Sequence, residues 1–454
     1  MAVLLSWNVM ITATPYFLSR LEGHRLKGTF NSYLSLTYTG VNFVSLAYAT
    51  ATATTSSASS IFRIRRASFV LIASFTSLTL SPLLPLSQGL FFTFVILNGM
   101  IQASAGSFLQ SAIVGLAALF GSELLANYFM GQAVVGVTVS AVQYIAAAMS
   151  SPRAKPASNM IDYDMEESSS GLSLFAFIFF GLAGSYMFGA LIAHSYLVRM
   201  PAYHSVMGSL EQRSGMIVEE EGLDPEGDLE HEPFLPHSAM GTSTNNLDEL
   251  QTPASISIWR IARANIVQNA TISWVFIITL SVFPPITSSI LSVNYSSSSS
   301  PRFFSPILFI SLHFLLFNIG DWMGRYICAI PRCQIWNSRS LAILSLSRTL
   351  FIPLFLLCNL SSPSSSLALS DTPFFNSDVI YWLILLSFSI TSGYVATMGM
   401  MAVSSLEHNP RLKKEEINTA ATVAQFCLIG GLAMGSLVSF GVRGWVCKCN
   451  PFVS

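Results

Sequence analysis

Charged side chains are scarce in this sequence. Only 10% of its 454 residues are Asp, Glu, Lys or Arg, whereas soluble domains carry about 25%. Hydrophobic residues make up 52% of the chain, a balance that belongs in a lipid bilayer. An excess of positive charge is also lacking. The formal net charge is -1, so the sequence gives no indication of a nucleic-acid partner.

Catalytic and cofactor motifs are lacking as well. Of the six cysteines, the only close pair is Cys447 and Cys449, which has neither zinc-site spacing nor a histidine partner. The sequence has no nucleotide-binding loop and no nucleophile elbow, so nothing in it supports ATP-driven pumping or hydrolysis. We therefore expect no enzymatic activity, no cofactor and no metal.

Long apolar runs are what the sequence does contain. A membrane-spanning helix needs about 17–25 apolar residues. Eleven runs come close to this or exceed it, at about 1–18, 30–54, 67–86, 89–118, 124–149, 171–197, 264–291, 304–329, 340–359, 378–403 and 417–442. They predict an all-α, polytopic membrane protein. The first run is short and Met1 falls inside it, which we interpret as a truncated start of the sequence.

One long polar segment separates the sixth run from the seventh. It is rich in Asp and Glu between residues 219 and 232, too acidic to bury a core, and we expect it to be disordered. The predicted parts are an N-terminal six-helix bundle (1–199), this acidic cytosolic loop (200–258) and a C-terminal five-helix bundle (259–454). Arg and Lys are more frequent in the loops on the side of the acidic segment, which places the N-terminus in the cytosol and the C-terminus on the opposite side.

The eighth run combines apolar length with charge. At helical spacing one narrow face carries Phe314, Asn318, Asp321 and Arg325. Asp321 and Arg325 are four residues apart with the acid first, the better order for an ion pair. Ionised groups at bilayer depth face the bundle interior, pair and usually serve function. Gly320 and Gly324 lie on the opposite face, where small residues let another helix approach closely.

The fourth run has a second polar stripe. Asn98, Gln102, Gly106 and Gln110 recur every four residues. Hydrogen bonding between helices explains such residues in part, but three amides exceed what helix association needs, so we favour the lining of a cavity. In the first run, Trp7 lies several turns deep, where it either walls the same cavity or packs in the core.

Many spans and few charges within them, without a catalytic set, indicate a transporter. Asp321 and Arg325 cancel in charge, so the site suits a neutral, hydroxyl-rich solute better than an ion. Asp321 would accept hydrogen bonds from hydroxyls, Arg325 and Asn318 would donate them, and aromatic side chains would cover a flat ring.

With these residues in hand, the chain resembles the equilibrative nucleoside transporter family, with a fungal member expected. Five motifs carry the resemblance in family order: WNVMITATPYF from Trp7, QSAIVGLAALF from Gln110, MGQAVVG from Met130, FNIGDWMGR from Phe317 and SGYVATMGMM from Ser392. The resemblance implies a major-facilitator-like bundle of 11 transmembrane helices, arranged six plus five. It implies carriage of nucleosides, and in some members nucleobases, by alternating access.

The resemblance also implies roles for single residues. Asp321 and Arg325 are implied to hold the ribose, and Gln110 to meet the base. The implied lining of the site adds Trp7, Leu4, Phe283, Phe314, Asn318 and Leu432. Gly106 matches a glycine tied to transport, and Asn8, Gly320 and Gly324 are expected to serve packing or gating. Ser6 departs from the family, because many members have proline before the tryptophan.

Two other functions remain open at this point. Asp321 could titrate and couple uptake of the same solutes to protons. Alternatively, the protein could be a receptor or scaffold whose long loop recruits partners, with the charge pair only stabilising the fold. The expected partners are a nucleoside, purine or pyrimidine, and the lipid bilayer, with the protein a monomer. The vacuolar or endolysosomal membrane and the plasma membrane are both compatible with the sequence.

Overall fold

The protein is described from a computed structural model. It describes all residues except 1, 24, 28, 53–56, 151–162, 202, 207, 209–256, 295–304, 360–373 and 448–454. Most of the acidic segment predicted over 200–258 therefore lies outside the described residues. The regular elements of the described chain are helices, as the apolar runs predict.

Helices up to α7 form one group. They are α1 (Ala2–Thr12), α2 (Thr14–Arg20), α3 (Phe30–Ala51), α4 (Ser57–Leu80), α5 (Gln88–Leu119), α6 (Ser122–Ser150) and α7 (Tyr163–Val198). The predicted first span is broken at Ala13, and Pro15 lies in the first turn of α2. Proline is tolerated there because the first turn of a helix leaves its N–H groups without helical partners.

Helices from α9 onward form the second group. They are α9 (Ile258–Ala264), α10 (Ile266–Val282), α11 (Pro306–Ile327), α12 (Ser338–Ser347), α13 (Phe351–Leu356), α14 (Asp378–Ser404) and α15 (Ile417–Cys447). α10 ends at Val282, ahead of Pro284 and Pro285, since proline lacks the N–H that would continue the helix.

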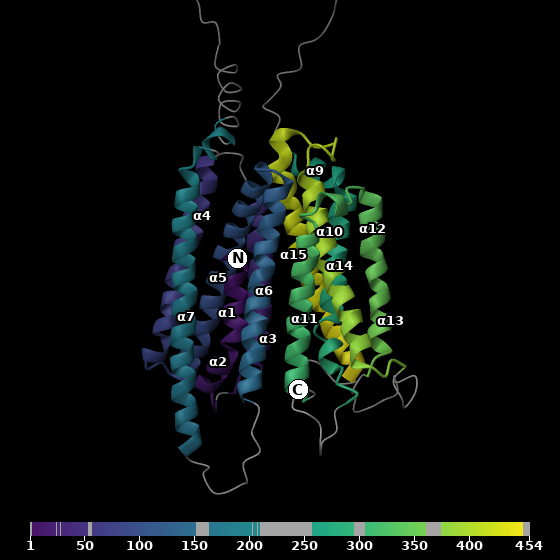
Figure 1. Cartoon of the computed structure of the whole chain (residues 1–454). Helices are drawn as coiled ribbons and strands as arrows, with labels where there is room; N and C mark the ends of the chain where they lie inside the picture. The colour runs from purple at the N-terminus through teal and green to yellow at the C-terminus, as the bar shows by residue number, and fades with distance from the viewer. Residues whose placement is uncertain are drawn as a thin grey trace, which may run out of the picture.

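The long helices run side by side along one common direction (Figure 1). Helices up to α7 lie on the left of this view, and those from α9 to α15 on the right. The two groups meet where α6 packs on α11 and α5 packs on α15. Residues on α6 and α11 are therefore among those that can interact across the middle of the molecule.

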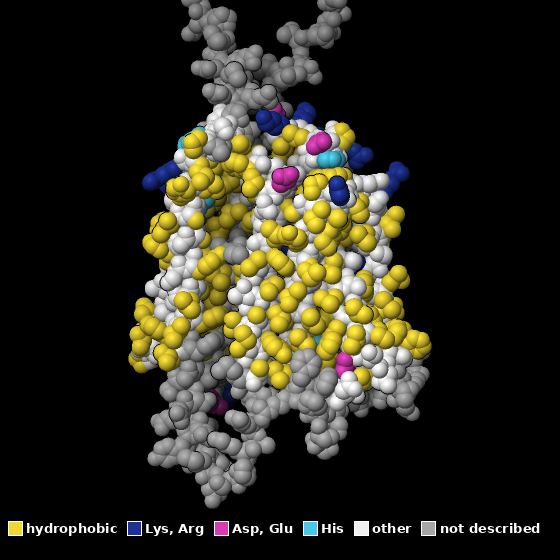
Figure 2. All heavy atoms as spheres, in the orientation of Figure 1, with side chains coloured by type: hydrophobic (Ala, Val, Ile, Leu, Met, Phe, Trp, Pro, Cys, Tyr) yellow, Lys and Arg dark blue, Asp and Glu magenta, His cyan; other side chains and the backbone are white. Residues whose placement is uncertain are grey.

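The outer surface is that of a membrane protein. Eight helices of the described chain are long and apolar enough to cross a bilayer. Large apolar side chains such as Leu36, Val44 and Ile343 are more than 60% exposed, which suits contact with lipid rather than water. Figure 2 shows hydrophobic side chains over the middle of the visible face and most of the Lys and Arg side chains at the end where α9 lies. The protein is a multi-pass membrane protein.

Candidate functional site

The predicted ion pair is present on α11. Arg325 Nε donates to Asp321 Oδ2 at 2.8 Å, and the two side chains are 10% and 13% exposed. Arg325 Nη1 also donates to the Phe129 carbonyl oxygen on α6 at 3.4 Å, and its guanidinium lies 5.9 Å from the centre of the Phe129 ring. The charges thus face the other group of helices rather than lipid.

A second arginine lies within electrostatic range of Asp321. Arg348, between α12 and α13, is fully buried. Its Nη1 donates to the Phe388 carbonyl oxygen and to Thr391 Oγ1, each at 2.6 Å, and its Nη2 donates to Thr279 Oγ1 at 2.8 Å. Arg348 was not among the predicted site residues. The rule that singled out Asp321, a charge inside an apolar run, would have found it.

The opposite face of α11 is pressed against α14. A Cβ atom added at Gly320 would overlap the Ser389 side chain, and one at Gly324 would overlap the Ile390 carbonyl oxygen. Side chains at these two positions would push the helices apart. The close contact holds α11 with its charged face turned toward α6.

Asn318 joins the charged face to α6. Its Nδ2 donates to the Phe314 carbonyl oxygen at 2.8 Å, one turn earlier on the same helix. Its amide oxygen packs against Gly136 so closely that a Cβ atom there would overlap it. Gly136 belongs to the MGQAVVG motif, so this motif supplies the gap that the asparagine fills.

Three aromatic rings gather next to Asn318. Phe283 stacks on Phe317 with ring centres 4.1 Å apart and planes inclined by 13°. It also meets the edge of Phe314 at 4.9 Å and 66°. Phe283 follows the last residue of α10, so the end of that helix at the proline pair places its ring on α11.

The stripe on α5 divides into two parts with different surroundings. Asn98 accepts from Ser74 Oγ at 2.6 Å and from Gln102 Nε2 at 2.8 Å, and its Nδ2 donates to Ser77 Oγ at 2.7 Å. Ser74 and Ser77 lie on α4. The favoured interpretation of the whole stripe as a cavity lining is therefore wrong for Asn98, whose amide bonds two serines of α4 and Gln102. Gln102 is fully buried, and its Oε1 has no partner among the described residues.

The other end of the stripe is open. Gln110 is only 6% exposed, and no hydrogen bond of its side chain joins it to the described residues. Gly106, one turn away, is buried, yet a Cβ atom added there would meet no other atom within 4 Å. An amide that reaches open space can bind a ligand, because it can both donate and accept hydrogen bonds.

The remaining predicted residues lie on two helices, α1 and α15. Trp7 packs on Tyr38 of α3, with ring centres 4.7 Å apart, and Asn8 is half-buried on the same helix, α1. Leu432 of α15 packs against an apolar cluster that includes Leu46. Leu4 lies in α1, but its side chain is outside the described set.

Two cavities of defined volume lie away from the charge pair. One, of about 840 Å³, is apolar and lies between α1, α6 and α7. The other, of about 560 Å³, lies between α4 and α5. Among the described residues, no group of three or more His, Cys, Asp and Glu side chains could hold a metal ion.

The family model described as "Nucleoside transporter" matches residues 95–444, which is more than half of the chain. The chain belongs to the nucleoside transporter family. The matched range includes Gln110, Phe283 and the Asp321–Arg325 pair, whereas Trp7 and Leu4 precede it.

Several nucleoside transporters resemble the chain over most of its length. Human equilibrative nucleoside transporter 1 is 28% identical over 361 residues, covering 78% of this chain and 70% of that protein. Human equilibrative nucleoside transporter 2 is 26% identical, covering 97% and 94%. Nucleoside transporter FUN26 of Saccharomyces cerevisiae is 26% identical, covering 77% and 64%. A solved structure of the E. coli fucose:proton symporter FucP aligns with a TM-score of 0.46 at 13% identity, covering 99% and 92%.

Proposed function

We propose that this protein carries nucleosides across a membrane by facilitated diffusion, with alternating access to a polar site between its two groups of helices. The family supports the class of solute. The observation that carries the site is the Asp321–Arg325 pair on α11, which is nearly buried and directed at α6. A pair of opposite charges gives polar contacts to a solute without requiring that the solute be charged.

The hydrogen-bonding atoms of the pair that are still unused match a sugar with two adjacent hydroxyls. Within the described residues, Oδ1 of Asp321 and Nη2 of Arg325 make no hydrogen bond to protein. A ribose hydroxyl can donate to the first and a second hydroxyl can accept from the other. We propose that these two residues hold the ribose.

The base would lie toward Gln110 and the aromatic side chains. An amide can both donate and accept, which suits the edge of a purine or a pyrimidine. Phe283 and Phe314 offer ring faces and edges for stacking, with Asn318 between them and the charge pair. Trp7, Leu4 and Leu432 complete the proposed lining, and nucleobases are further candidate substrates.

The proposed architecture is a major-facilitator-like bundle of eleven spans, six before and five after a cytosolic loop at 200–258. The clustering of Lys and Arg at the α9 end of the molecule supports placing that end in the cytosol. The two groups would rock around the site, as in carriers built from two halves. The proposed location is a vacuolar, endolysosomal or plasma membrane, and the proposed unit is a monomer.

The test is uptake of labelled uridine and adenosine by the purified protein in proteoliposomes. Gln110→Ala should raise KM for at least one of the two solutes while the protein remains folded. Gln102→Ala is the matched control, because this amide of the same helix is fully buried and its Nε2 donates to Asn98 Oδ1 at 2.8 Å. The control should lower thermal stability and leave KM unchanged.

Two results would refute the proposal. Absence of uptake by well-folded wild-type protein, over a panel of nucleosides and nucleobases, would refute the function. Unchanged KM for both solutes in Gln110→Ala would remove this residue from the site. Deleting residues 209–250 separates a carrier from a scaffold, because a carrier should still transport when all of its proposed site residues lie elsewhere.

A further inference from the structure

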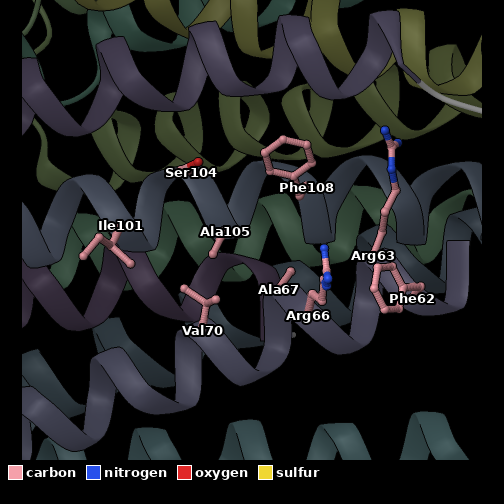
Figure 3. A pocket seen from close by; sticks show the side chains of 9 residues that line it. All are labelled: Phe62, Arg63, Arg66, Ala67, Val70, Ile101, Ser104, Ala105 and Phe108. Atoms are coloured by element: carbon pink, nitrogen blue, oxygen red, sulfur yellow. The ribbon is translucent and has the colours of Figure 1, made fainter. Parts of the chain in front are cut away.

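The cavity between α4 and α5 combines a cationic end with an apolar floor. Figure 3 shows Arg63, Arg66 and Phe62 toward one end of the row of lining side chains, and Val70 and Ile101 toward the other. Ala105 and Phe108 of α5 lie along the row between the two ends. Its volume is about 560 Å³. None of these residues belongs to the proposed transport site.

The two arginines of the cavity differ in the hydrogen bonds that their guanidinium groups make to the protein. Arg63 donates from Nη2 to the Thr52 carbonyl oxygen at 2.8 Å and from Nη1 to the Ala49 carbonyl oxygen at 3.3 Å, so it holds the last turn of α3. Arg66 is exposed, and its guanidinium lies 4.0 Å from the centre of the Phe62 ring. In the described chain no acidic side chain pairs with either one.

Arg66 lies near one end of its candidate membrane span. It lies six residues into a candidate span that begins at Ser60. Two turns of helix place it near the boundary between lipid head groups and acyl chains. The α4 start also lies toward the α9 end of the molecule, which carries most of the visible Lys and Arg and which we place in the cytosol. Anionic lipids give the cytosolic leaflet its negative surface potential, and basic pockets between spans bind their head groups.

The floor of the cavity faces the acyl-chain region. Val70 is 42% and Ile101 50% exposed, so both are open to the bilayer along the direction that leads away from the arginines. A soluble anion would use only the arginines. A lipid would use both ends at once, because its phosphate and its chain are joined in one molecule.

We propose that this cavity binds an anionic glycerophospholipid. Its phosphate lies on the Arg66 guanidinium, with Arg63 beside it, and one acyl chain runs along Val70, Ala105 and Ile101. The chain's own acidic segment at 219–232 is the competing occupant for the arginines. The lipid is favoured because an acidic peptide offers nothing to the apolar floor. This inference does not depend on the proposed transport function.

The experiment titrates the full-length protein in neutral detergent with dioleoylphosphatidylserine or dioleoylphosphatidylcholine, and measures Tm and bound lipid by native mass spectrometry. The serine lipid should raise Tm and remain bound, and the choline lipid should do so less. Arg66→Gln should weaken binding about fivefold, the contribution of one basic residue at an anionic membrane surface. Arg65→Gln is the matched control, because this neighbouring arginine is exposed but does not line the cavity.

A second pair of variants tests the apolar floor. Val70→Trp should fill the floor and weaken binding of the serine lipid, whereas Phe69→Trp, at an exposed neighbour outside the cavity, should not.

Equal losses in Arg65→Gln and Arg66→Gln would overturn the proposal in favour of diffuse surface charge. Inorganic phosphate that displaces the lipid from wild type, with Val70→Trp binding normally, would reduce the site to an anion site. Binding that appears only after deletion of 209–250 would assign the site to the acidic segment.

Discussion

Gly136 of α6 lies so close to Asn318 of α11 that a Cβ atom on the glycine would overlap the asparagine amide. α6 and α11 belong to different groups of helices, so this contact joins the two across the middle of the molecule. The asparagine amide is also held by its own bond to the Phe314 carbonyl oxygen and cannot simply turn away.

Gly136→Ala should therefore destabilise the protein by about 1–3 kcal/mol, the usual cost of overpacking. It should also slow transport, because Asn318 is displaced from the face that carries the ion pair. Gly189→Ala on α7 is the control, since a Cβ atom there meets nothing within 4 Å. Thermal melting and uridine uptake of both variants give the comparison, and equal behaviour would contradict the tight α6–α11 contact.

For the buried Gly106, unlike Gly136, substitution is predicted to leave the stability of the fold nearly unchanged. Its Cβ direction is open, so Gly106→Ala and Gly106→Val should change Tm little. If the open space is the substrate path beside Gln110, the larger side chain should lower the rate of uptake severalfold. A loss of uptake in proportion to a loss of folded protein would indicate packing instead.

The helices were largely predictable, since runs of sufficient apolar length fold as helices in lipid. The breaks within these helices were less predictable. Pro284 and Pro285 account for the end of α10, and Pro15 marks the break at Ala13, but nothing in the local pattern marked the 3-10 turn at Arg348. The Arg348 side chain bonds α10 and α14 at this turn, and a single-helix pattern does not contain such contacts.

The candidate site was predictable only where one helix determines it. The Asp321–Arg325 pair follows from spacing on a single helix, so the sequence predicted it. Asn98 and Gln110 look alike in the α5 stripe, and only the serines of the neighbouring α4 separate them. Which amide is bonded and which is open depends on packing between helices, which residue spacing alone does not describe.

Arg348 is predicted to stabilise the fold of the second group of helices. Arg348→Met would remove three buried hydrogen bonds, to Thr279 Oγ1, Thr391 Oγ1 and the Phe388 carbonyl oxygen, which costs about 1–3 kcal/mol. Arg348→Lys should not restore Tm fully, because one ammonium cannot reproduce the planar fork that reaches all three oxygens. Arg339→Met, exposed on α12, should leave Tm unchanged. Equal melting of wild type and Arg348→Met would contradict the role.

The ion pair itself allows folding and binding to be separated. Removing one partner strands a buried charge, at a cost of about 3–5 kcal/mol, whereas removing both charges together is often close to neutral. Asp321→Asn and Arg325→Gln should each lower Tm, and the double variant should recover most of the loss. The double variant should still fail to transport, because it offers the ribose neither a carboxylate nor a guanidinium. Recovery of uptake together with Tm would instead assign the pair to the stability of the fold.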